Sequence, residues 1–477
     1  MERRRLAILI ISVLTFGLLV NRFIPQVSAL AMLIVLIVLY LWLLTLSMVH
    51  RKRMDLKRPR PINRAYQPKV SIIIAAHNEQ NVIAQTVETM LALSYPDFEV
   101  LVMDDRSTDS TPVILQGLAR KLDDARFRYF VRPSDAFPGK SAVLNDALTL
   151  TDGEVICVFD ADASVAPDFL YRIVPFLADD NVGAVQARKV IANADYNWLT
   201  HCQNYEYSLD AYVQCGRESV YGAVELRGNG ELIKREALND VDGFNNYSIT
   251  DDLDVSTRLH LAGWDIRFAH KVLVFEEGIT EFKPLLKQRK RWAEGSLVRY
   301  LENMDKLLIT RNVSIRTMLD MIAYMVQFML PLWVVLDLLA LGVDAMFGEP
   351  TRTRVLSSLL ITPIIAIGSS HTLVIAIIRF NCRANPDGPL PWESVMKALP
   401  HALQWAGYTG LYMTSLWLPT TFAMTMKLLF NKERSLSWER TEHKGHSHQT
   451  LPVSPNASTD SDSGSVSSLS PPSSRSA

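Results

Sequence analysis

Two carboxylates, one residue apart, follow a strongly apolar stretch of this 477-residue chain. Asp160 and Asp162 come directly after the run 155–159. Side chains two residues apart on an extended strand point to the same side, so we expect these two to converge on one cation. Their hard oxygen ligands suit Mg²⁺ or Mn²⁺, ions that in enzymes commonly also bind substrate phosphates. By itself such a pair is more often a polar turn after a buried strand, so the metal site depends on the surrounding motifs.

Three further carboxylates follow predicted strands in the same part of the chain. Glu79 comes shortly after the apolar run 70–75, and Asp104 and Asp105 follow the run 98–103. Ligands of α/β sheets bind beyond the carboxyl ends of the strands. We therefore expect all five acids at one edge of a sheet. A metal ion and a polyhydroxylated or basic ligand would explain such a group of unpaired carboxylates.

A second acidic motif, Thr250-Asp251-Asp252-Leu253-Asp254, opens a predicted helix that runs to about Ala262. Thr250 is the expected N-cap, and the positive end of a helix favours acids in its first turn. Capping explains why acids occur here, but it does not explain three of them. A carboxylate directed into a cleft can act as the general base on a sugar-acceptor hydroxyl, and Asp252 is our candidate.

Two turns that contain glycine lie close to these acids in the predicted domain. The first, Arg227-Gly228-Asn229-Gly230-Glu231, precedes the apolar pair Leu232-Ile233. Its glycines would let the backbone approach a ligand closely, although a plain turn explains the pattern equally well. The second, Pro138-Gly139-Lys140, leads into a predicted helix over 141–150.

A basic amphipathic segment from about Lys283 to Leu308 carries the motif Gln288-Arg289-Lys290-Arg291-Trp292. Its apolar residues, among them Leu285, are typical of a helix on a membrane surface, where the arginines would attract anionic lipid. The stronger interpretation is a role at an acceptor and a diphosphate. Arginine pairs well with phosphate oxygens, and the indole of Trp292 can pack against a sugar ring.

These motifs require an α/β domain to position them. Apolar runs predict strands at 70–75, 98–103, 127–131 and 155–159, and helical patterns occupy 82–93 and 141–150 between them. Another helix begins near Asp109 or Ser110, either of which can cap it. Alternating strands and helices indicate a mostly parallel sheet covered by helices.

The composition excludes some classes of protein. The formal net charge is -1, so nothing in it suggests a nucleic-acid partner. The four cysteines are too widely spaced for a zinc site and indicate no disulfide framework. Apolar runs at 6–20 and 29–49 predict a transmembrane hairpin, and further spans are predicted at 318–346, 355–378 and 402–426.

The distribution of positive charge predicts which side of the membrane each part occupies. Basic residues flank both outer ends of the first hairpin, which places the N-terminus and the catalytic domain in the cytoplasm. Basic residues follow each of the last two spans and favour the cytoplasm for both of these flanks. Five spans that start from a cytoplasmic N-terminus cannot place both flanks there. One stretch is therefore interfacial or re-entrant, or a break is missed. The predicted regions are a transmembrane hairpin (1–50), a basic linker (51–66), the α/β domain (67–278), amphipathic interfacial helices (279–312), a transmembrane region (313–430) and a disordered tail (431–477).

The motifs together resemble those of membrane-bound family 2 glycosyltransferases with a GT-A fold. The resemblance rests on Asp104-Asp105, Asp160-Ala161-Asp162, Thr250-Asp251-Asp252 and Gln288-x-x-Arg291-Trp292 in this order. Asp251 is a departure, because many relatives carry glutamate there. Arg227-Gly228-Asn229-Gly230, the stretch 249–254, Glu276-Glu277-Gly278 and the stretch 288–295 further resemble β-monoglucosyldiacylglycerol synthases of cyanobacterial type. This likeness covers about 68–310 and continues more loosely to about 445.

The resemblance implies a reaction and roles for the site residues. One glucose would pass from UDP-glucose to diacylglycerol with inversion, and Asp252 would deprotonate the lipid hydroxyl. The uracil would lie near Glu79, Asp104 and Asp105, Lys140 near the diphosphate, and Asp160 by the ribose. Asp162, with Asp160, would hold the Mg²⁺ or Mn²⁺. Asn229, Gln288, Arg291 and Trp292 would line the acceptor and diphosphate side.

Two alternatives remain open at this point. A processive polysaccharide synthase of the cellulose, hyaluronan or poly-N-acetylglucosamine type shares the core motifs. Such an enzyme needs a polar path through the membrane, which Asp320, Asp337 and Asp344 would line. A non-catalytic membrane protein that only binds nucleotide sugar is the second alternative, and the catalytic aspartates argue against it.

Overall fold

A computed structural model describes residues 60–324 without a break. It also describes positions within 15–52, 342–347 and 396–408, together with Gly445. In that part of the chain, no helix combines the length and the apolar character needed to cross a bilayer. The five predicted spans and the tail lie wholly or partly outside the described residues, so the predicted membrane topology stays a prediction.

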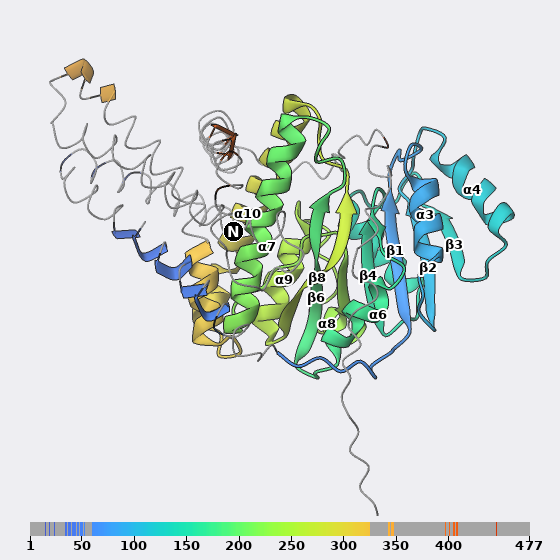
Figure 1. The fold of residues 1–477 in the computed structure, drawn as a ribbon, viewed down its shortest axis with the longest axis horizontal. Coiled ribbons are helices and arrows are strands. Elements are labelled where there is room, and N and C mark those ends of the chain that lie inside the picture. The colour runs from blue at the N-terminus through green and yellow to red at the C-terminus, as the bar shows by residue number, and fades with distance from the viewer. Residues whose placement is uncertain are drawn as a thin grey trace, which may run out of the picture.

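An eight-stranded mixed sheet organises the domain, with the strand order β3-β2-β1-β4-β7-β6-β8-β5 (Figure 1). The strands are β1 (Val70–Ala76), β2 (Phe98–Asp104), β3 (Phe127–Val131), β4 (Val155–Asp160), β5 (Ser164–Val165), β6 (Val182–Ile191), β7 (Glu231–Lys234) and β8 (Asp265–Glu276). The four predicted strands are confirmed as β1 to β4, which run parallel to one another. The expectation of a mostly parallel sheet is wrong beyond β4, because β7 runs antiparallel to both β4 and β6.

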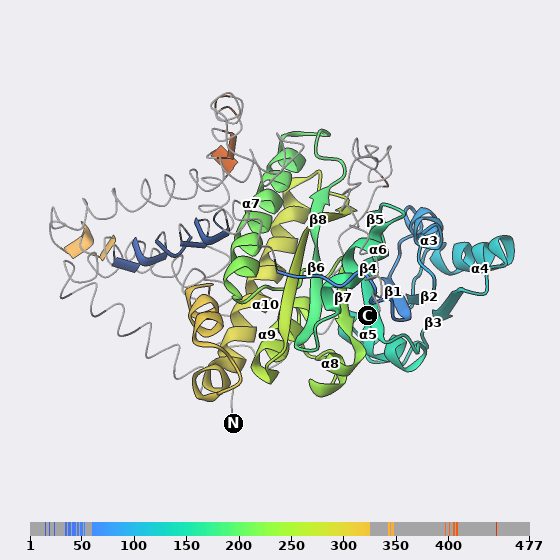
Figure 2. The ribbon, with the colours of Figure 1, turned by 60° about the horizontal axis from the view of Figure 1, so that its bottom comes forward.

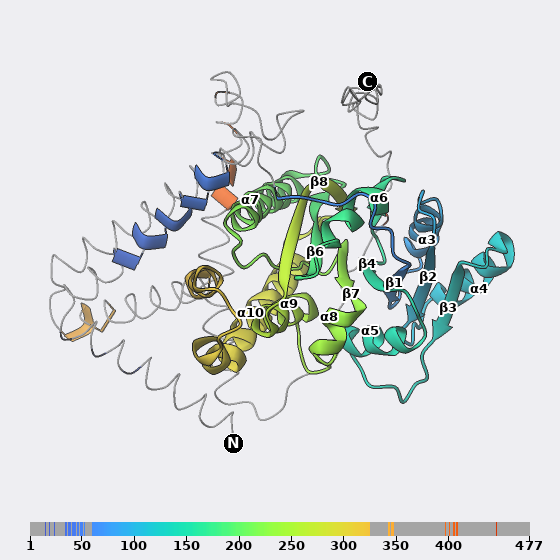
Figure 3. The same ribbon diagram turned by 90° about the horizontal axis from the view of Figure 1, so that it is seen from below.

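Helices cover both faces of this sheet. They are α3 (Ile83–Leu91), α4 (Thr111–Leu122), α5 (Lys140–Thr149), α6 (Phe169–Ile173), α7 (Trp198–Val220), α8 (Arg235–Asp240), α9 (Asp251–Ala262) and α10 (Phe282–Ile309), with a short 3₁₀ helix η1 (Val174–Leu177). In Figures 1, 2 and 3, α4 lies beside β3 at one edge of the sheet, and α7 and α10 lie on the opposite side of the domain. The helices predicted at 82–93, 141–150, 250–262 and 283–308 are confirmed as α3, α5, α9 and α10.

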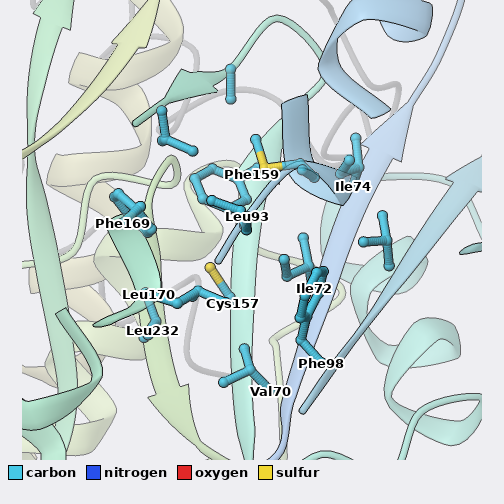
Figure 4. Packing of buried hydrophobic residues seen from close by; sticks show 14 of the residues in the cluster. Val70, Ile72, Ile74, Leu93, Phe98, Cys157, Phe159, Phe169, Leu170 and Leu232 are labelled. Carbon is cyan, nitrogen blue, oxygen red and sulfur yellow. The ribbon is translucent and has the colours of Figure 1, made fainter. Parts of the chain in front are cut away.

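The inner strands of the parallel half, β1, β2 and β4, are buried on both faces, which explains their largely apolar sequences. Along β1, Ile72 and Ile74 belong to one hydrophobic core, whereas Ile73 and Ala75 belong to the other. The first core lies under α3, α4 and α6, and the second lies under α5, α8 and α9. Figure 4 shows Phe159 of β4 in the first core with Ile72 and Ile74.

Local sequence sets where two of the helices begin. At the start of α4, the N-cap residue is Ser110, whose side chain makes no capping hydrogen bond, and Asp109 Oδ1 instead accepts a hydrogen bond from the Thr111 amide at 2.9 Å. At α9 the expected side-chain cap is wrong. Thr250 is the N-cap residue, but among the described residues its hydroxyl has no hydrogen-bond partner. The side chain is instead directed at α10, where a Cβ on Gly295 would lie 2.3 Å from Thr250 Cγ2.

A buried network of ion pairs joins the helices behind the site. Glu225 accepts hydrogen bonds from Arg299 of α10 at 2.7 Å, from Arg227 at 3.0 Å and from Arg217 of α7 at 3.3 Å. Burial would raise the pKa of Glu225, but the three guanidinium groups outweigh it and hold this pKa below its usual range. Arg299 also donates to the Leu253 carbonyl of α9 at 2.9 Å. The network therefore fixes α10 against α7 and the first turn of α9.

Asp320 belongs to the same network. Its carboxylate lies 3.1 Å from Arg217 Nε and accepts a hydrogen bond from the Ala223 amide at 2.8 Å. Only 1% of Asp320 is exposed. The suggestion that this residue lines a polar path for a polymer is therefore wrong, because its carboxylate serves to bind Arg217. Asp337 and Asp344 lie outside the described residues.

Candidate active site

The carboxyl ends of β1, β2 and β4 meet at one edge of the sheet, and the predicted acids lie there. Asp160 is the last residue of β4, and its Oδ1 accepts a hydrogen bond from Lys140 Nζ at 2.6 Å. Asp162 lies past the strand, in a turn, and its Oδ2 accepts the Glu277 amide at 2.7 Å. The two acids share an edge as predicted, but strand alternation is the wrong reason, because Asp162 is not part of the extended strand.

Lys140 connects three parts of this edge. Besides Asp160, its ammonium donates to the Gly228 carbonyl at 3.3 Å and lies 4.0 Å from Asp251 Oδ2. Burial alone would lower the pKa of Lys140, but attraction by Asp160 and Asp251 outweighs it and raises the pKa above its usual value. The residue is therefore a permanent cation between the β4 edge and the start of α9.

A group of polar contacts joins the loops after β1 and β2 where they cross. The Asn78 side chain accepts hydrogen bonds from the Thr108 amide at 2.6 Å and the Asp109 amide at 3.2 Å. Glu79 and Asp104 are buried at this crossing, and among the described residues Asp104 Oδ1 has no hydrogen-bond partner. Burial raises the pKa of Asp104. An unpartnered buried oxygen of this kind is a position where a ligand N–H or O–H can bind.

Asp105 differs from the expectation of an unpaired carboxylate. Arg106 binds both of its oxygens, at 2.8 and 2.9 Å, and Arg132 NH1 donates to Oδ1 at 2.7 Å. The side chain of Arg132 is 1% exposed, so this pair is shielded from water. Asp105 therefore holds the loop after β2 in place. Asp160 is also paired, because it accepts the hydrogen bond from Lys140.

Asp252 sits in the first turn of α9 and faces the glycine turn before β7. A Cβ on Gly228 would lie 3.3 Å from Asp252 Oδ2, and Gly228 has φ +74°, a conformation that favours glycine. Asp252 Oδ1 accepts the Leu253 amide at 2.8 Å. Burial and the neighbouring charge of Asp251 raise the pKa of Asp252 to about 6. A carboxylate with this pKa is suited to general-base catalysis near neutral pH.

Asn229 lies between the β4 edge and the end of β8. Its Oδ1 accepts the Asp160 amide at 3.3 Å, and its Nδ2 donates to Glu276 Oε2 at 3.0 Å. The carbonyl of Asn229 accepts a hydrogen bond from Gln186 of β6 at 2.9 Å. The turn that carries Gly228 and Asn229 is therefore held on both sides and links the predicted donor edge to Asp252.

The predicted Gln-x-x-Arg-Trp motif occupies the first half of α10. Gln288, Arg291 and Trp292 are half-buried there, and the close contact between Gly295 and Thr250 brings this helix against the start of α9. The guanidinium carbon of Arg289 lies 4.0 Å from the centroid of the Trp292 ring, and Arg289 NH2 donates to Glu206 at 2.7 Å. Trp292 as a sugar-packing residue, like the roles of Gln288 and Arg291, stays a prediction.

One residue assigned to a membrane surface is placed elsewhere. Leu285 is fully buried and packs with Cys202 and Tyr205 of α7. The apolar side of α10 at this position faces the protein, because amphipathic periodicity is the same for a helix on a membrane and for one on a protein core.

Several polar residues near the site were missed or had no role assigned. Lys189, Tyr207 and Glu276 form one group of contacts beside Asn229, and Glu231 is buried next to Gly228. Glu276 stood only within a motif that carried the resemblance, and Glu231 only at the end of the glycine turn. Lys189 lies on β6 and Tyr207 on α7, two elements that the sequence analysis did not identify, and no spacing signal connects them.

The donor edge fits the cation that the sequence predicts. Among the residues that the structure describes, no three His, Cys, Asp or Glu side chains gather into a complete metal site. Mg²⁺ is commonly held by one or two carboxylates and completes its shell with waters and substrate phosphates. Asp160, with 35% of its side chain exposed at this edge, and Asp162 match that incomplete set.

The fold and the site define an enzyme class. The mixed α/β sheet, with acids at the carboxyl ends of its parallel strands, matches the GT-A type of glycosyltransferase fold. The family described as "Glycosyltransferase like family 2" matches residues 68–295. A β-monoglucosyldiacylglycerol synthase of Trichormus variabilis is 37% identical over 414 residues, which cover 85% of this chain and 83% of that protein. The chain therefore belongs to glycosyltransferase family 2.

Two further similarities agree with this assignment. A β-monoglucosyldiacylglycerol synthase of a Nostoc species is 44% identical over 305 residues, which cover 63% of this chain and 64% of that protein. A mannosyltransferase of Pyrobaculum calidifontis, solved with GDP-Man and Mn²⁺, matches with a TM-score of 0.57 at 20% identity. That match covers 84% of this chain and 100% of the other, and it supports the fold. The predicted resemblance to family 2 and to the glucolipid synthases is confirmed.

Proposed function

We propose that this enzyme transfers a single glucose from UDP-glucose to 1,2-diacylglycerol and forms β-monoglucosyldiacylglycerol. The supporting observation is that two kinds of acid lie close together. Asp160 and Asp162 can bind a cation at the sheet edge, and Asp252 is a buried base of raised pKa. Gly228 and Lys140 connect the two. The extended similarity to two β-monoglucosyldiacylglycerol synthases supports glucose and diacylglycerol as the substrates.

The donor binds along the carboxyl edge of the parallel strands. The uracil lies beside Glu79, Asp104 and the loop that Asp105 holds, where the unpartnered Asp104 oxygen accepts a nucleobase N–H. The ribose lies by Asp160. Lys140 exchanges its contact with Asp160 for the diphosphate, so its positive charge follows the phosphate oxygens.

The catalytic step is one displacement at C1 of the glucose. Asp252 accepts the proton of the lipid hydroxyl, the hydroxyl oxygen forms the new bond to C1, and the C1–phosphate oxygen bond breaks. Because the hydroxyl attacks from the face opposite the diphosphate, the α-linked donor yields a β-glucoside. Mg²⁺ or Mn²⁺ held by Asp160 and Asp162 supplies charge stabilisation for the departing UDP. Lys140 adds a second positive charge on the same side.

We place this catalytic domain on the cytoplasmic side of a multi-pass membrane protein, between transmembrane helices at 1–50 and 313–430. The apolar sequences and the basic residues that flank them support this arrangement. Diacylglycerol keeps its acyl chains in the bilayer, and its hydroxyl reaches Asp252 beside α10. Gln288, Asn229, Arg291 and Trp292 close the acceptor and diphosphate side.

The test is product analysis with membranes that contain the full-length protein. Incubation with labelled UDP-glucose and diacylglycerol, followed by mass spectrometry, is expected to give a monohexosyl lipid and no longer products. Asp162→Ala should abolish the product, and chelation of divalent cations should stop the wild-type reaction until Mg²⁺ or Mn²⁺ is restored. A ladder of long chains with no monohexosyl lipid at any time point would instead indicate a polysaccharide synthase. Full turnover in metal-free buffer would rule out the cation.

A further inference from the structure

A cluster of four polar residues lines the site beside the catalytic machinery. Lys189 of β6 and Glu276 of β8 form an ion pair at 2.9 Å, and the Asn229 amide donates to the same Glu276 oxygen at 3.0 Å. The Tyr207 hydroxyl of α7 donates to the other oxygen of Glu276. Lys189 also lies 5.1 Å from the centroid of the Tyr207 ring. Side chains from three other segments, β6, α7 and the turn before β7, therefore converge on the Glu276 carboxylate of β8.

The cluster lies between the sheet edge that carries Asp160 and Asp162, where the nucleotide sugar is proposed to bind, and the proposed general base Asp252. On one side, Asn229 accepts the Asp160 amide at 3.3 Å, and the residue that follows Glu276 donates its amide to Asp162 at 2.7 Å. On the other side, Lys189 donates to the Arg227 carbonyl at 3.3 Å, and the next residue, Gly228, lies against Asp252. A sugar whose C1 joins the diphosphate and meets a hydroxyl activated by Asp252 must lie in this interval.

The chemistry of the cluster suits a neutral, polyhydroxylated ring. The side chains of Lys189 and Glu276 remain 13% and 12% exposed, so the ion pair reaches the surface of the site. The three described hydrogen bonds leave Glu276 room for another, because a carboxylate accepts about four hydrogen bonds. A carboxylate and an ammonium beside each other offer both an acceptor and a donor to sugar hydroxyls.

We infer that Lys189, Tyr207, Asn229 and Glu276 form the subsite that binds the hydroxyl groups of the transferred hexose. The inference rests on the proposed function, because it takes the hexose of a nucleoside diphosphate sugar as the ligand. Asn229 and Tyr207 hold Glu276 in place, and the Lys189–Glu276 pair contacts the sugar. A site built to hydrogen-bond a hydroxyl discriminates strongly against an analogue that places it differently.

The experiment compares two ligands that differ only by the sugar. The purified full-length protein is titrated with UDP and with UDP-glucose in the presence of Mg²⁺, as wild type and as Glu276→Gln and Lys189→Gln. We expect each variant to keep its affinity for UDP within about two-fold and to lose about ten-fold in affinity for UDP-glucose, the scale of one charge-assisted hydrogen bond. The preference for UDP-glucose over UDP-galactose in the transfer rate should fall with it.

Controls separate this result from a general loss of structure. Asp152→Asn removes a lysine–carboxylate pair on the surface, with Lys69, and should change neither affinity. Tyr207→Phe keeps the ring and removes one hydrogen bond, so it should weaken UDP-glucose binding less than Glu276→Gln. Equal losses of UDP and UDP-glucose affinity in the cluster variants, with unchanged preference for glucose, would overturn the subsite. Wild-type protein that binds neither UDP nor UDP-glucose would instead contradict the proposed function itself.

Discussion

At the scale of single residues, the site is governed by how burial acts on charge. Asp252 and Glu231 are both buried acids near Gly228, yet the structure treats them differently. Burial and Asp251 raise the pKa of Asp252 to about 6 against the opposing cations Lys140 and Arg227. Burial and the two neighbouring aspartates raise the pKa of Glu231 well above its usual value, although Lys140 acts against them. Asp252 is thus suited to accept a proton near neutral pH, whereas Glu231 holds its proton more tightly than an ordinary glutamate.

We predict that Asp252→Asn keeps UDP-glucose affinity but loses transfer by a factor on the order of 10²–10⁴, the usual contribution of a general base. Because the carboxylate must be ionised to accept a proton, the wild-type rate should fall as pH drops below about 6. Pre-steady-state rates and donor titrations on the same preparation provide the measurement. Collapse of donor affinity with a normal rate per bound donor would assign Asp252 to binding.

Glu231 leads to a prediction about stability rather than rate. The side chain is fully buried, its Oε2 accepts the Gly228 amide at 2.9 Å, and among the described residues its Oε1 has no partner. Its raised pKa means that the folded state keeps a proton that the unfolded chain releases above the ordinary glutamate pKa of 4.5. This contribution to stability is complete below that pH and is lost as the pH rises toward the folded pKa.

Glu231→Gln should therefore raise the melting temperature in detergent, and the gain should grow between about pH 5 and pH 8 as the wild type loses its contribution. Glutamine keeps the size of the side chain and an acceptor for the Gly228 amide. A stability difference that does not vary with pH would show that Glu231 is ionised in the folded protein.

At the scale of elements, the site depends on how closely α9 and α10 pack. A Cβ on Gly295 would lie 2.3 Å from Thr250 Cγ2, so Gly295→Ala has to push the two helices apart at the position of the catalytic turn. We expect a loss of about 1–3 kcal/mol in unfolding free energy, the typical cost of overpacking, together with a fall in transfer rate.

The matched control for this variant is Gly117→Ala, in the middle of α4. An added Cβ there meets nothing within 4 Å, so alanine should leave the rate unchanged and stabilise the helix by about 0.5–1 kcal/mol. Chemical denaturation and transfer assays of both variants test the pair. Equal changes in stability and transfer rate in the two glycine variants would mean that the space between Thr250 and Gly295 can accommodate a methyl group.

At the scale of the whole molecule, one buried carboxylate connects the helices around the site. Glu225 binds Arg217, Arg227 and Arg299, and Arg217 also binds Asp320 in the helical stretch 315–324 that follows α10. A network of this kind is difficult to interrupt at one point, because removal of one member leaves opposite charges buried without a counter-ion.

Glu225→Gln should accordingly cost about 3–5 kcal/mol of unfolding free energy, the range found when one partner of a buried pair is removed. Glu88→Gln, which breaks the exposed contact with Lys121 at 3.2 Å, should change stability by less than about 1 kcal/mol. Thermal unfolding of both variants in the same detergent compares them directly. Similar losses of unfolding free energy in the two variants would show that the buried Glu225 network stabilises the fold no more than an exposed ion pair does.

The sequence by itself determined the parallel half of the sheet and the main acids. Strands buried on both faces leave uninterrupted apolar runs, and their carboxyl ends must share an edge, so Asp104 and Asp160 were predictable. Asp252 was predictable from its place in a first helical turn and from the resemblance of its motif. These signals are local, because they depend only on the residues next to one another in the chain.

Only the tertiary structure decided which charges pair and which polar residues meet. Lys189 and Glu276 are brought together by the parallel pairing of β6 with β8, and neither its register nor its irregularities can be read from either segment alone. The same holds for Arg132 on Asp105, for Arg217 on Asp320 and for Thr250 against Gly295. Each is a contact between residues distant in sequence, and only the packed fold sets its distance, its burial and therefore its effect on charge.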